Sequence, residues 1–182
     1  MVNMRPFTAF EQKNLKFLVN HNVKFTQVEI TPTGLGKGIL DSTAPMRAYF
    51  LENGIHNYEE QLQGQEHKQI KAACILTDTT QFFTKVSFYR PNTKKGDPRM
   101  WVYGFGSYTE GNDIHVLFWH EKTLYSINIT HIDIEKCYNS AIITPMQEVL
   151  KAINQEGNSV SEELLGRFRA VKDQWFESEV TA

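Results

Sequence analysis

Four basic residues lie close together in the segment FYRPNTKKGDPRMWVYGF, residues 88–105: they are Arg90, Lys94, Lys95 and Arg99. Arginine offers planar, bidentate donors for phosphate or for the edge of guanine, and lysine adds a point charge. Asn92 and Thr93, in the same segment, can hydrogen-bond a phosphate or a base. These residue types at this spacing predict contact with a polyanion.

The residues around these cations predict a β-hairpin. Apolar runs at 81–89 and 98–106 are typical of strands, and residues 92–97 between them include Asn, Gly and Asp, which tolerate tight turns. Such a hairpin would hold Arg90 and Arg99 near one another at its base and the two lysines at its tip. A protruding two-stranded ribbon fits the major groove of DNA. The alternative is a solvated loop in which Asp97 pairs with one arginine and the lysines keep a sheet edge soluble.

The distribution of charge is more informative than the net charge of the chain. The 182 residues carry a formal net charge of −2, but residues 85–99 hold five cations and one acid, a local net charge of +4. We expect Lys85, Lys68 and Lys37 to neutralise phosphates alongside the hairpin.

A second arm of the same surface is predicted in the glutamine-rich stretch QLQGQEHKQI, residues 61–70. Gln63, Gln65 and Lys68 from this stretch, with Lys71 after it, can grip DNA together with the hairpin.

A competing chemistry involves Glu66 and Lys68, which stand two residues apart and would share one face of a strand. A Glu-x-Lys pair with an upstream aspartate is the arrangement of magnesium-dependent nucleases of the PD-(D/E)xK kind, in which carboxylates bind Mg²⁺ and the lysine lies near the attacking water. Asp41 is the available upstream acid, although it lies beside the predicted start of a helix. The alternative is a solvated strand edge, because such pairs arise by chance in a chain with 22% charged residues.

Two further features predict no catalytic or metal chemistry. The glycine-rich stretch TPTGLGKG, residues 31–38, predicts a turn-rich loop, and it lacks the Gly-Lys-Ser/Thr ending of a P-loop. In a DNA-binding protein, the backbone N–H groups of this loop and Lys37 would contact a DNA phosphate. Cys74 and Cys137 have neither CxxC nor Cys/His spacing, which predicts buried free thiols. DNA binding requires no cofactor, whereas the nuclease alternative requires Mg²⁺.

The elements that must position these residues predict an α+β fold. A strand at 23–30 precedes five further runs of strand character: IKAACIL, QFFTKVSFY, PRMWVYGFG, DIHVLFW and TLYSINIT. The connections between these runs are short, which favours antiparallel pairing in a meander or barrel from about residue 23 to 130.

Helices are predicted at both ends of this sheet and within its first connection. They are expected at 10–22, from Pro45 with Ser42 or Thr43 as cap to a stop at Gly54, from the cap Thr144 through 146–154, and after the capping box Ser159–Glu162. The last helix carries Leu164, Phe168, Val171 and Trp175 on one face. This stripe would pack on the barrel or, alternatively, bind a partner or a downstream domain.

The length and the hydrophobic content of 41% fit one globular domain with a helical appendage, and we predict boundaries of 1–143 and 144–182. No apolar run approaches the roughly 20 residues of a membrane span, and the amino terminus lacks the layout of a secretory signal. We therefore expect a cytoplasmic protein that makes no membrane contact.

The run SFYRPNTKKGDPRMWVYGFGSYTEGNDIHVLFWHEKTLYSINI resembles the central part of the amino-terminal DNA-recognition domain of EcoRII-type restriction endonucleases, over roughly a quarter of the chain. Arg90, Thr93, Lys94 and Arg99 match the arginine, Lys/Thr and arginine elements of that family. Asp97 stands where the family more often has glutamate, and Pro98 departs from the family at the start of the second strand.

The resemblance implies a fold and a function. The family's domain is a pseudobarrel of mainly antiparallel strands with short flanking helices, similar to the DNA-binding domain of a large class of plant transcription factors. It implies sequence-specific binding of double-stranded DNA in a restriction or related defence system, without catalysis in this domain. The family's enzymes carry a separate nuclease domain, so the resemblance makes this chain the DNA-reading part of such a system or a fragment of a longer enzyme, with a nuclease domain or subunit as partner.

Overall fold

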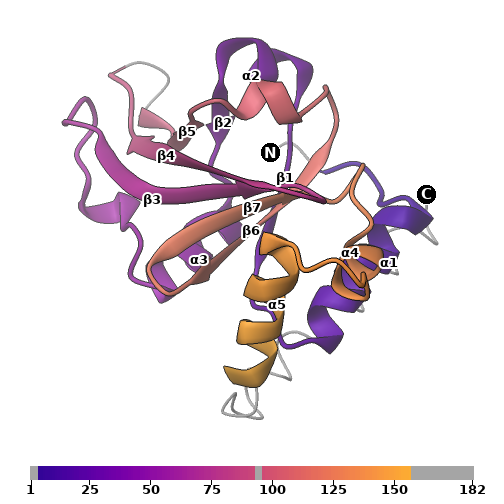
Figure 1. Ribbon diagram of the computed structural model, residues 1–182. Helices are drawn as coiled ribbons and strands as arrows, with labels where there is room; N and C mark the ends of the chain where they lie inside the picture. The colour runs from indigo at the N-terminus through magenta and orange to yellow at the C-terminus, as the bar shows by residue number, and fades with distance from the viewer. Residues whose placement is uncertain (1–3, 93–95, 157–182) are drawn as a thin grey trace. The chain divides into compact units, whose positions relative to one another are not determined.

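A computed structural model describes residues 4–92 and 96–156 of the chain. The described part is an α+β fold in which a seven-stranded mixed sheet curls into a half-barrel (Figure 1). The strands are β1 Thr26–Glu29, β2 Ile39–Asp41, β3 Lys68–Leu76, β4 Gln81–Tyr89, β5 Arg99–Val102, β6 Ile114–His120 and β7 Thr123–Asn128. The helices are α1 Ala9–Asn20, α2 Pro32–Lys37, α3 Ala44–Glu52, α4 Ile134–Tyr138 and α5 Pro145–Glu156, with 3-10 turns η1 Tyr58–Glu60 and η3 Phe105–Tyr108.

The strand order is β1-β6-β7-β3-β4-β5-β2. The five strands predicted after residue 67 are all present, and β4 and β5 pair antiparallel as predicted. The prediction of a meander is wrong for one pair of strands: β5 and β6 are consecutive in sequence but are not neighbours in the sheet. Instead β5 pairs antiparallel with β2, β6 pairs antiparallel with β1, and β7 lies beside β3.

The glycine-rich stretch after β1 is a short helix, so the prediction of a turn-rich loop there is wrong. Thr31 caps α2 by accepting a hydrogen bond from the Gly34 N–H at 3.0 Å, and Pro32 occupies its first turn. Gly38 ends the helix in the left-handed conformation with φ 71°, which glycine adopts without strain. Lys37 therefore lies exposed at the carboxyl end of the helix, away from the amino-terminal N–H groups.

The predicted helices within the described range are confirmed with small shifts at their ends. Thr8 and Glu11 form a capping box on α1. In α3, Thr43 is the amino-terminal cap residue, Pro45 lies in the first turn and Asn53 is the carboxyl-terminal cap residue. Thr144 accepts a hydrogen bond from the Gln147 N–H at 3.2 Å and caps α5. The helix predicted after Ser159, with its apolar stripe, lies outside the described residues. No described helix is long and apolar enough to cross a membrane.

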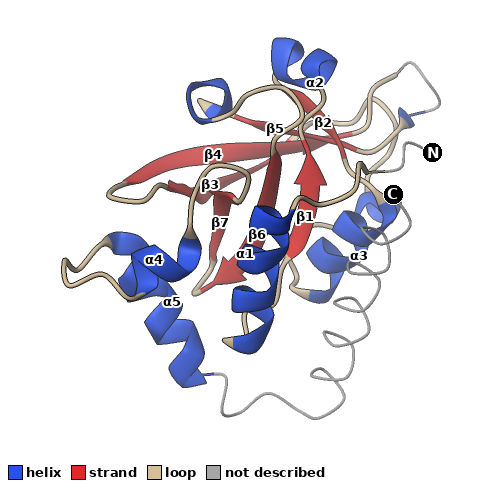
Figure 2. Cartoon of the chain, turned by 90° about the vertical axis from the view of Figure 1, so that its right-hand side faces the viewer, coloured by secondary structure: helices blue, strands red, loops and turns tan. Residues whose placement is uncertain are grey.

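The chain divides into two compact units. The first unit comprises Met1–Lys24, Leu76–Gln81 and Ile127–Ala182, and within it α4 lies beside α5 (Figure 2). The buried Asn14 side chain of α1 donates to the carbonyls of Ile129 and Ile132 at 2.8 and 2.7 Å, and the Ile134 N–H donates back to it. The boundary predicted between residues 143 and 144 stays a prediction.

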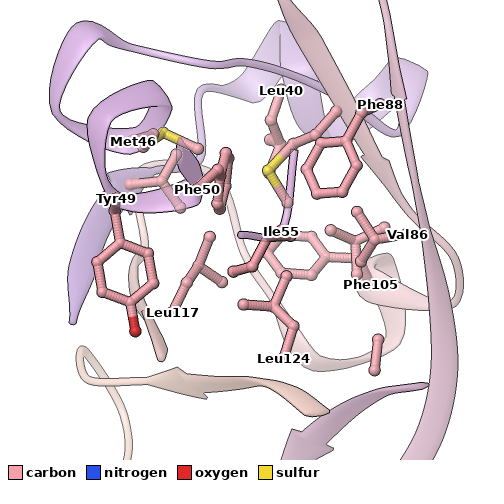
Figure 3. Packing of buried hydrophobic residues seen from close by; sticks show 14 of the residues in the cluster. Leu40, Met46, Tyr49, Phe50, Ile55, Val86, Phe88, Phe105, Leu117 and Leu124 are labelled. Atoms are coloured by element: carbon pink, nitrogen blue, oxygen red, sulfur yellow. The ribbon is translucent and has the colours of Figure 1, made fainter. Parts of the chain in front are cut away.

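The second unit comprises Phe25–Ile75 and Phe82–Ser126 and contains the larger apolar core. Met46 and Phe50 of α3 point toward Val86, Phe88 and Leu117 of the sheet (Figure 3). The rings of Phe50 and Phe88 meet edge to face with centroids 5.1 Å apart. Because Phe88 and Met100 face this core, the alternating residues of β4 and β5 must face the other side of the sheet. Cys74, in this unit, and Cys137, in the first unit, are buried free thiols, as predicted.

Candidate nucleic-acid interface

Two polar segments of the second unit line one open groove of about 750 Å³. The first wall is the stretch before and at the start of β3, and the second wall is the end of β4 and the residues after it. The lining residues are Gly64, Gln65, Glu66, His67, Gln69, Tyr89, Arg90, Pro91 and Asn92. The glutamine-rich stretch and the base of the basic loop therefore lie together. That they form two arms of one DNA-gripping surface stays a prediction.

Hydrogen bonds hold these two walls at a fixed separation. The Gly64 N–H donates to the Arg90 carbonyl at 2.7 Å, and Gln63 Nε2 donates to the Asn92 carbonyl at 2.8 Å. Gly64 has a φ of 75°, and a Cβ at this position would lie 1.9 Å from Asn92 Oδ1. The positive φ therefore favours glycine at position 64, and any larger residue there would also displace the exposed Asn92 side chain.

The buried side chain of Gln61 connects the first wall to β4 by hydrogen bonds. Its Nε2 donates to the Phe88 carbonyl at 3.0 Å and to the Glu66 carbonyl at 3.3 Å. Its Oε1 accepts from His56 Nε2 at 3.0 Å, and the His56 ring stacks on Phe88 with centroids 4.9 Å apart. Burial lowers the pKa of His56, an effect that the hydrogen bond to Gln61 partly opposes and the charge of Lys68 reinforces.

The guanidinium of Arg90 is engaged with the main chain. Its Nε donates to the Gly96 carbonyl at 2.8 Å, and its Nη1 donates to the Gln61 carbonyl at 3.1 Å and lies 3.5 Å from the Tyr58 carbonyl. These contacts join the two ends of the basic loop to the first wall of the groove. Arg90 therefore holds the two walls of the groove together. Among its guanidinium nitrogens, only Nη2 makes no hydrogen bond to a main-chain carbonyl of the described residues.

Arg99 occupies a different environment on the outer face of the sheet. It pairs in register with Tyr89 of β4 and with Asp41 of β2, and its Nε lies 3.7 Å from Asp41 Oδ1. The Arg99 side chain is 17% exposed, whereas that of Asp41 is 80% exposed. Both arginines have partners other than Asp97, so the predicted ion pair of Asp97 with one of them is not seen among the described residues. Asp97 is exposed.

Tyr89 connects Arg99 to the groove. The ring of His67 stacks on Tyr89 with centroids 4.4 Å apart and an interplanar angle of 10°. Burial raises the pKa of Tyr89, while the charge and hydrogen bond of Arg99 oppose this and the charge of Asp41 adds to it. The cation of Arg99 is thus held beside a neutral phenol at the edge of the groove.

The remaining predicted DNA contacts fall into three groups. Asn92 is exposed and lines the groove, and Lys68 is exposed at the start of β3. Lys85 lies elsewhere on the outer face, with its Nζ 4.4 Å from the centre of the Tyr103 ring, and Lys37 is the last residue of α2. Thr93, Lys94 and Lys95 lie outside the described residues.

The residues of the nuclease alternative are spread over the sheet. Glu66 lines the groove and Lys68 begins β3, but Asp41 lies in β2, which two strands separate from β3. Three strand spacings amount to roughly 14 Å, and the partner of Asp41 is Arg99. In the described part of the chain, no group of three potential metal ligands includes Asp41 or Glu66.

Sequence reasoning missed His67, Gln69 and the bracing side chains His56 and Gln61. The uninterrupted polar run from Gln63 to Gln69 was a usable indication of an exposed wall. The stack of His67 on Tyr89 joins residues from two segments that are distant in sequence, and no local pattern indicates it.

No family model matches the chain, and neither curated proteins nor solved structures show a significant similarity to it.

Proposed function

We propose that this chain binds double-stranded DNA in a sequence-specific manner through the groove between residues 64–69 and 89–92. The observation that carries the proposal is the lining of the groove, where exposed amide and carboxylate side chains able to recognise base edges stand beside Arg90. The half-barrel sheet is compatible with the pseudobarrel that the sequence resemblance implies, and we propose that finer fold as well.

The side chains in the groove have the donor and acceptor patterns that base recognition needs. Asn92 and Gln69 are exposed amides, which can bond adenine in a bidentate manner through its N6 and N7. Gln65 is also exposed, but its Oε1 accepts from the Leu62 N–H at 2.8 Å, so it offers a base mainly its amino group. Glu66 is an exposed acceptor for the N4 amino group of cytosine. Fixed walls matter here because bidentate contacts tolerate little misplacement.

The cations divide into two tasks in this proposal. Arg99, at the edge of the groove, reads a base or clamps a phosphate, and Lys68, Lys85 and Lys37 neutralise phosphates together with Lys94 and Lys95. Arg90 keeps the two walls in place and contributes at most its Nη2 to DNA. In a restriction or defence system, such a domain would direct a nuclease domain or subunit to its target.

The test is selection from a randomised duplex pool followed by fluorescence anisotropy on the enriched and a scrambled duplex, at two salt concentrations. We expect an enriched motif, intact DNA and steeply salt-dependent affinity. Asn92→Ala and Gln65→Ala should each reduce discrimination between the two duplexes by roughly tenfold. The matched control is Lys16→Ala, an exposed cation of α1 outside the groove, which should bind as the wild type does. Absence of any enriched motif would contradict sequence-specific recognition.

A further inference from the structure

The outer face of β4 and β5 carries a row of aromatic side chains with cations beside it. Met100 and Val102 of β5 face the core, so Arg99 and Trp101 face outward. Tyr103 continues the row, because its N–H donates to the Lys85 carbonyl at 3.1 Å and its ring stacks on Trp101 with centroids 5.5 Å apart and an interplanar angle of 5°.

This aromatic row is partly exposed to solvent and has a lysine in contact with it. Trp101 and Tyr103 are partly exposed, and Phe83, which lies two positions before Lys85 on β4, is 74% exposed. The Nζ of Lys85 lies 4.4 Å from the centre of the Tyr103 ring, a cation–π distance. Arg99 precedes Trp101 by two residues on the same face, where its side chain lies beside Asp41. Lys85 therefore supplies the cation that contacts the row directly, and Arg99 lies at the end of the row.

We propose that this aromatic row, formed by Phe83, Trp101 and Tyr103 with Lys85, is a second nucleic-acid site that binds unpaired nucleobases. Bases inside a closed duplex stack on one another and cannot use a protein ring, whereas unpaired bases of any sequence stack on aromatic side chains beside cations that meet the phosphates. The row therefore fits a single strand or an extrahelical nucleotide.

The position of the row relative to the groove adds a specific consequence. Tyr89 lines the groove and pairs in register with Arg99, which belongs to the same face of β5 as Trp101. A strand that leaves the groove along β5 would pass from polar base-reading side chains to stacking rings. The inference extends the proposed function but does not depend on it, because single-strand binding by the row requires no duplex recognition by the groove.

The direct test is binding of labelled oligo(dT) of twenty nucleotides to the full chain by anisotropy, together with intrinsic tryptophan emission. We expect the oligonucleotide to quench tryptophan emission, and we expect Trp101→Phe to lose the quenched component while Trp119 and Trp175 still emit. Trp101→Leu should weaken oligo(dT) binding about tenfold or more. Lys85→Gln, which keeps the rings, should lower the salt dependence by about 0.7 in the slope of log K against log salt.

Controls separate this site from a folding defect and from the groove. Thermal melting followed by circular dichroism should show that each variant folds, and Tyr103→Leu provides a second stacking variant if Trp101→Leu does not. Trp101→Leu should still bind the enriched duplex, and Asn92→Ala should still bind oligo(dT). Equal oligo(dT) affinity of wild type and both stacking variants would overturn the inference. Quenching of tryptophan emission by maltohexaose, a sugar oligomer without bases, and not by oligo(dT) would also overturn it. Failure of the enriched duplex to bind the wild type would overturn only the groove.

Discussion

The Nε hydrogen of Arg90 is donated to the carbonyl oxygen of Gly96, 2.8 Å away, so the two ends of the basic loop are tied by a side chain of the loop itself. The same guanidinium donates to the Gln61 carbonyl at 3.1 Å on the opposite wall of the groove. An arginine that looks like a DNA ligand in the sequence is thus largely occupied in organising the site. Arg99, the arginine that follows the basic loop, has its side chain beside Asp41 instead.

Replacing Arg90 by lysine should lower stability as well as DNA affinity. An ammonium group cannot reproduce two divergent donations to main-chain carbonyls, so we expect a loss of about 1–3 kcal/mol in the free energy of unfolding. Urea denaturation of Arg90→Lys measures this loss, with Arg99→Lys as the matched variant that keeps charge at the neighbouring position. Wild-type stability in Arg90→Lys would show that the loop is held by other contacts.

Arg99 and Lys94 should differ in the kind of DNA binding that they support. Arg99→Ala should relax specificity and cost about 1–3 kcal/mol on the enriched duplex. Lys94→Ala should weaken binding to all sequences alike and flatten the salt dependence. Anisotropy titrations on enriched and scrambled duplexes distinguish the two effects, and equal losses on both duplexes for both variants would defeat the division of tasks.

Incubation with Mg²⁺ should leave DNA intact if the groove is a recognition site. The wide separation of Asp41 from the Glu66 and Lys68 pair gives no shared metal position in the described sheet. Gel analysis of a plasmid and of the enriched duplex, with and without Mg²⁺, checks this expectation. Metal-dependent cleavage that disappears in Glu66→Ala would establish the nuclease instead.

The ion pair of Arg5 and Glu11 should make the first unit sensitive to acid. Burial alone would raise the pKa of the fully buried Glu11, but hydrogen bonds from Arg5, Thr130 and the Thr8 N–H, with the Arg5 charge, lower it below its ordinary value of 4.5. A lowered folded-state pKa gives stability that is complete above about pH 4.5 and is lost as the pH falls through the folded value. Glu11→Gln should cost about 2 kcal/mol at pH 7, less than a fully buried pair because Arg5 is partly exposed. The difference from wild type, measured by chemical denaturation, should shrink in acid; a constant difference would mean that Glu11 acts without its charge.

His56 should make the groove sensitive to mild acid. Burial lowers its pKa below the ordinary 6.5, so between these two values the unfolded chain binds a proton that the folded chain does not. Stability therefore falls as the pH drops below about 6.5 and levels off below the folded pKa. His56→Gln should remove this contribution, and comparison of unfolding free energies at pH 7.5 and 5.5 measures it. An identical pH dependence in the variant would show that other groups cause the effect.

The strands were the most predictable part of this fold because their apolar alternation and their short connections are local properties. The neighbours of β5 were not predictable in the same way. Pairing with β2 joins residues 39–41 to residues 99–101, and no local pattern encodes a contact between segments so distant in sequence. The helix α2 was missed because two glycines lower helix propensity, although Thr31, Pro32 and Gly38 were suitable cap, first-turn and stop residues.

The candidate site shows a similar division. The sequence placed Gln63, Gln65 and Asn92 on one surface, and the hydrogen bonds between residues 63–64 and 90–92 bring the two segments together. The different tasks of the two arginines could not be predicted from the sequence. Arg90 is engaged by the carbonyl of Gln61, which lies far from it in sequence. Arg99 is placed on the outer face by its register with Tyr89, which no local pattern encodes.

The two outermost strands of the sheet, β1 and β2, both come from the first 41 residues of the chain. During synthesis they leave the ribosome before their partners, which for β2 and β1 are residues 99–101 and 114–117. Each early strand must therefore wait with unpaired N–H and C=O groups until these later residues have been made. The short lengths of four and three residues limit the exposed edge during this delay, and a ribosome stalled before residue 99 would present two strands whose partners do not yet exist.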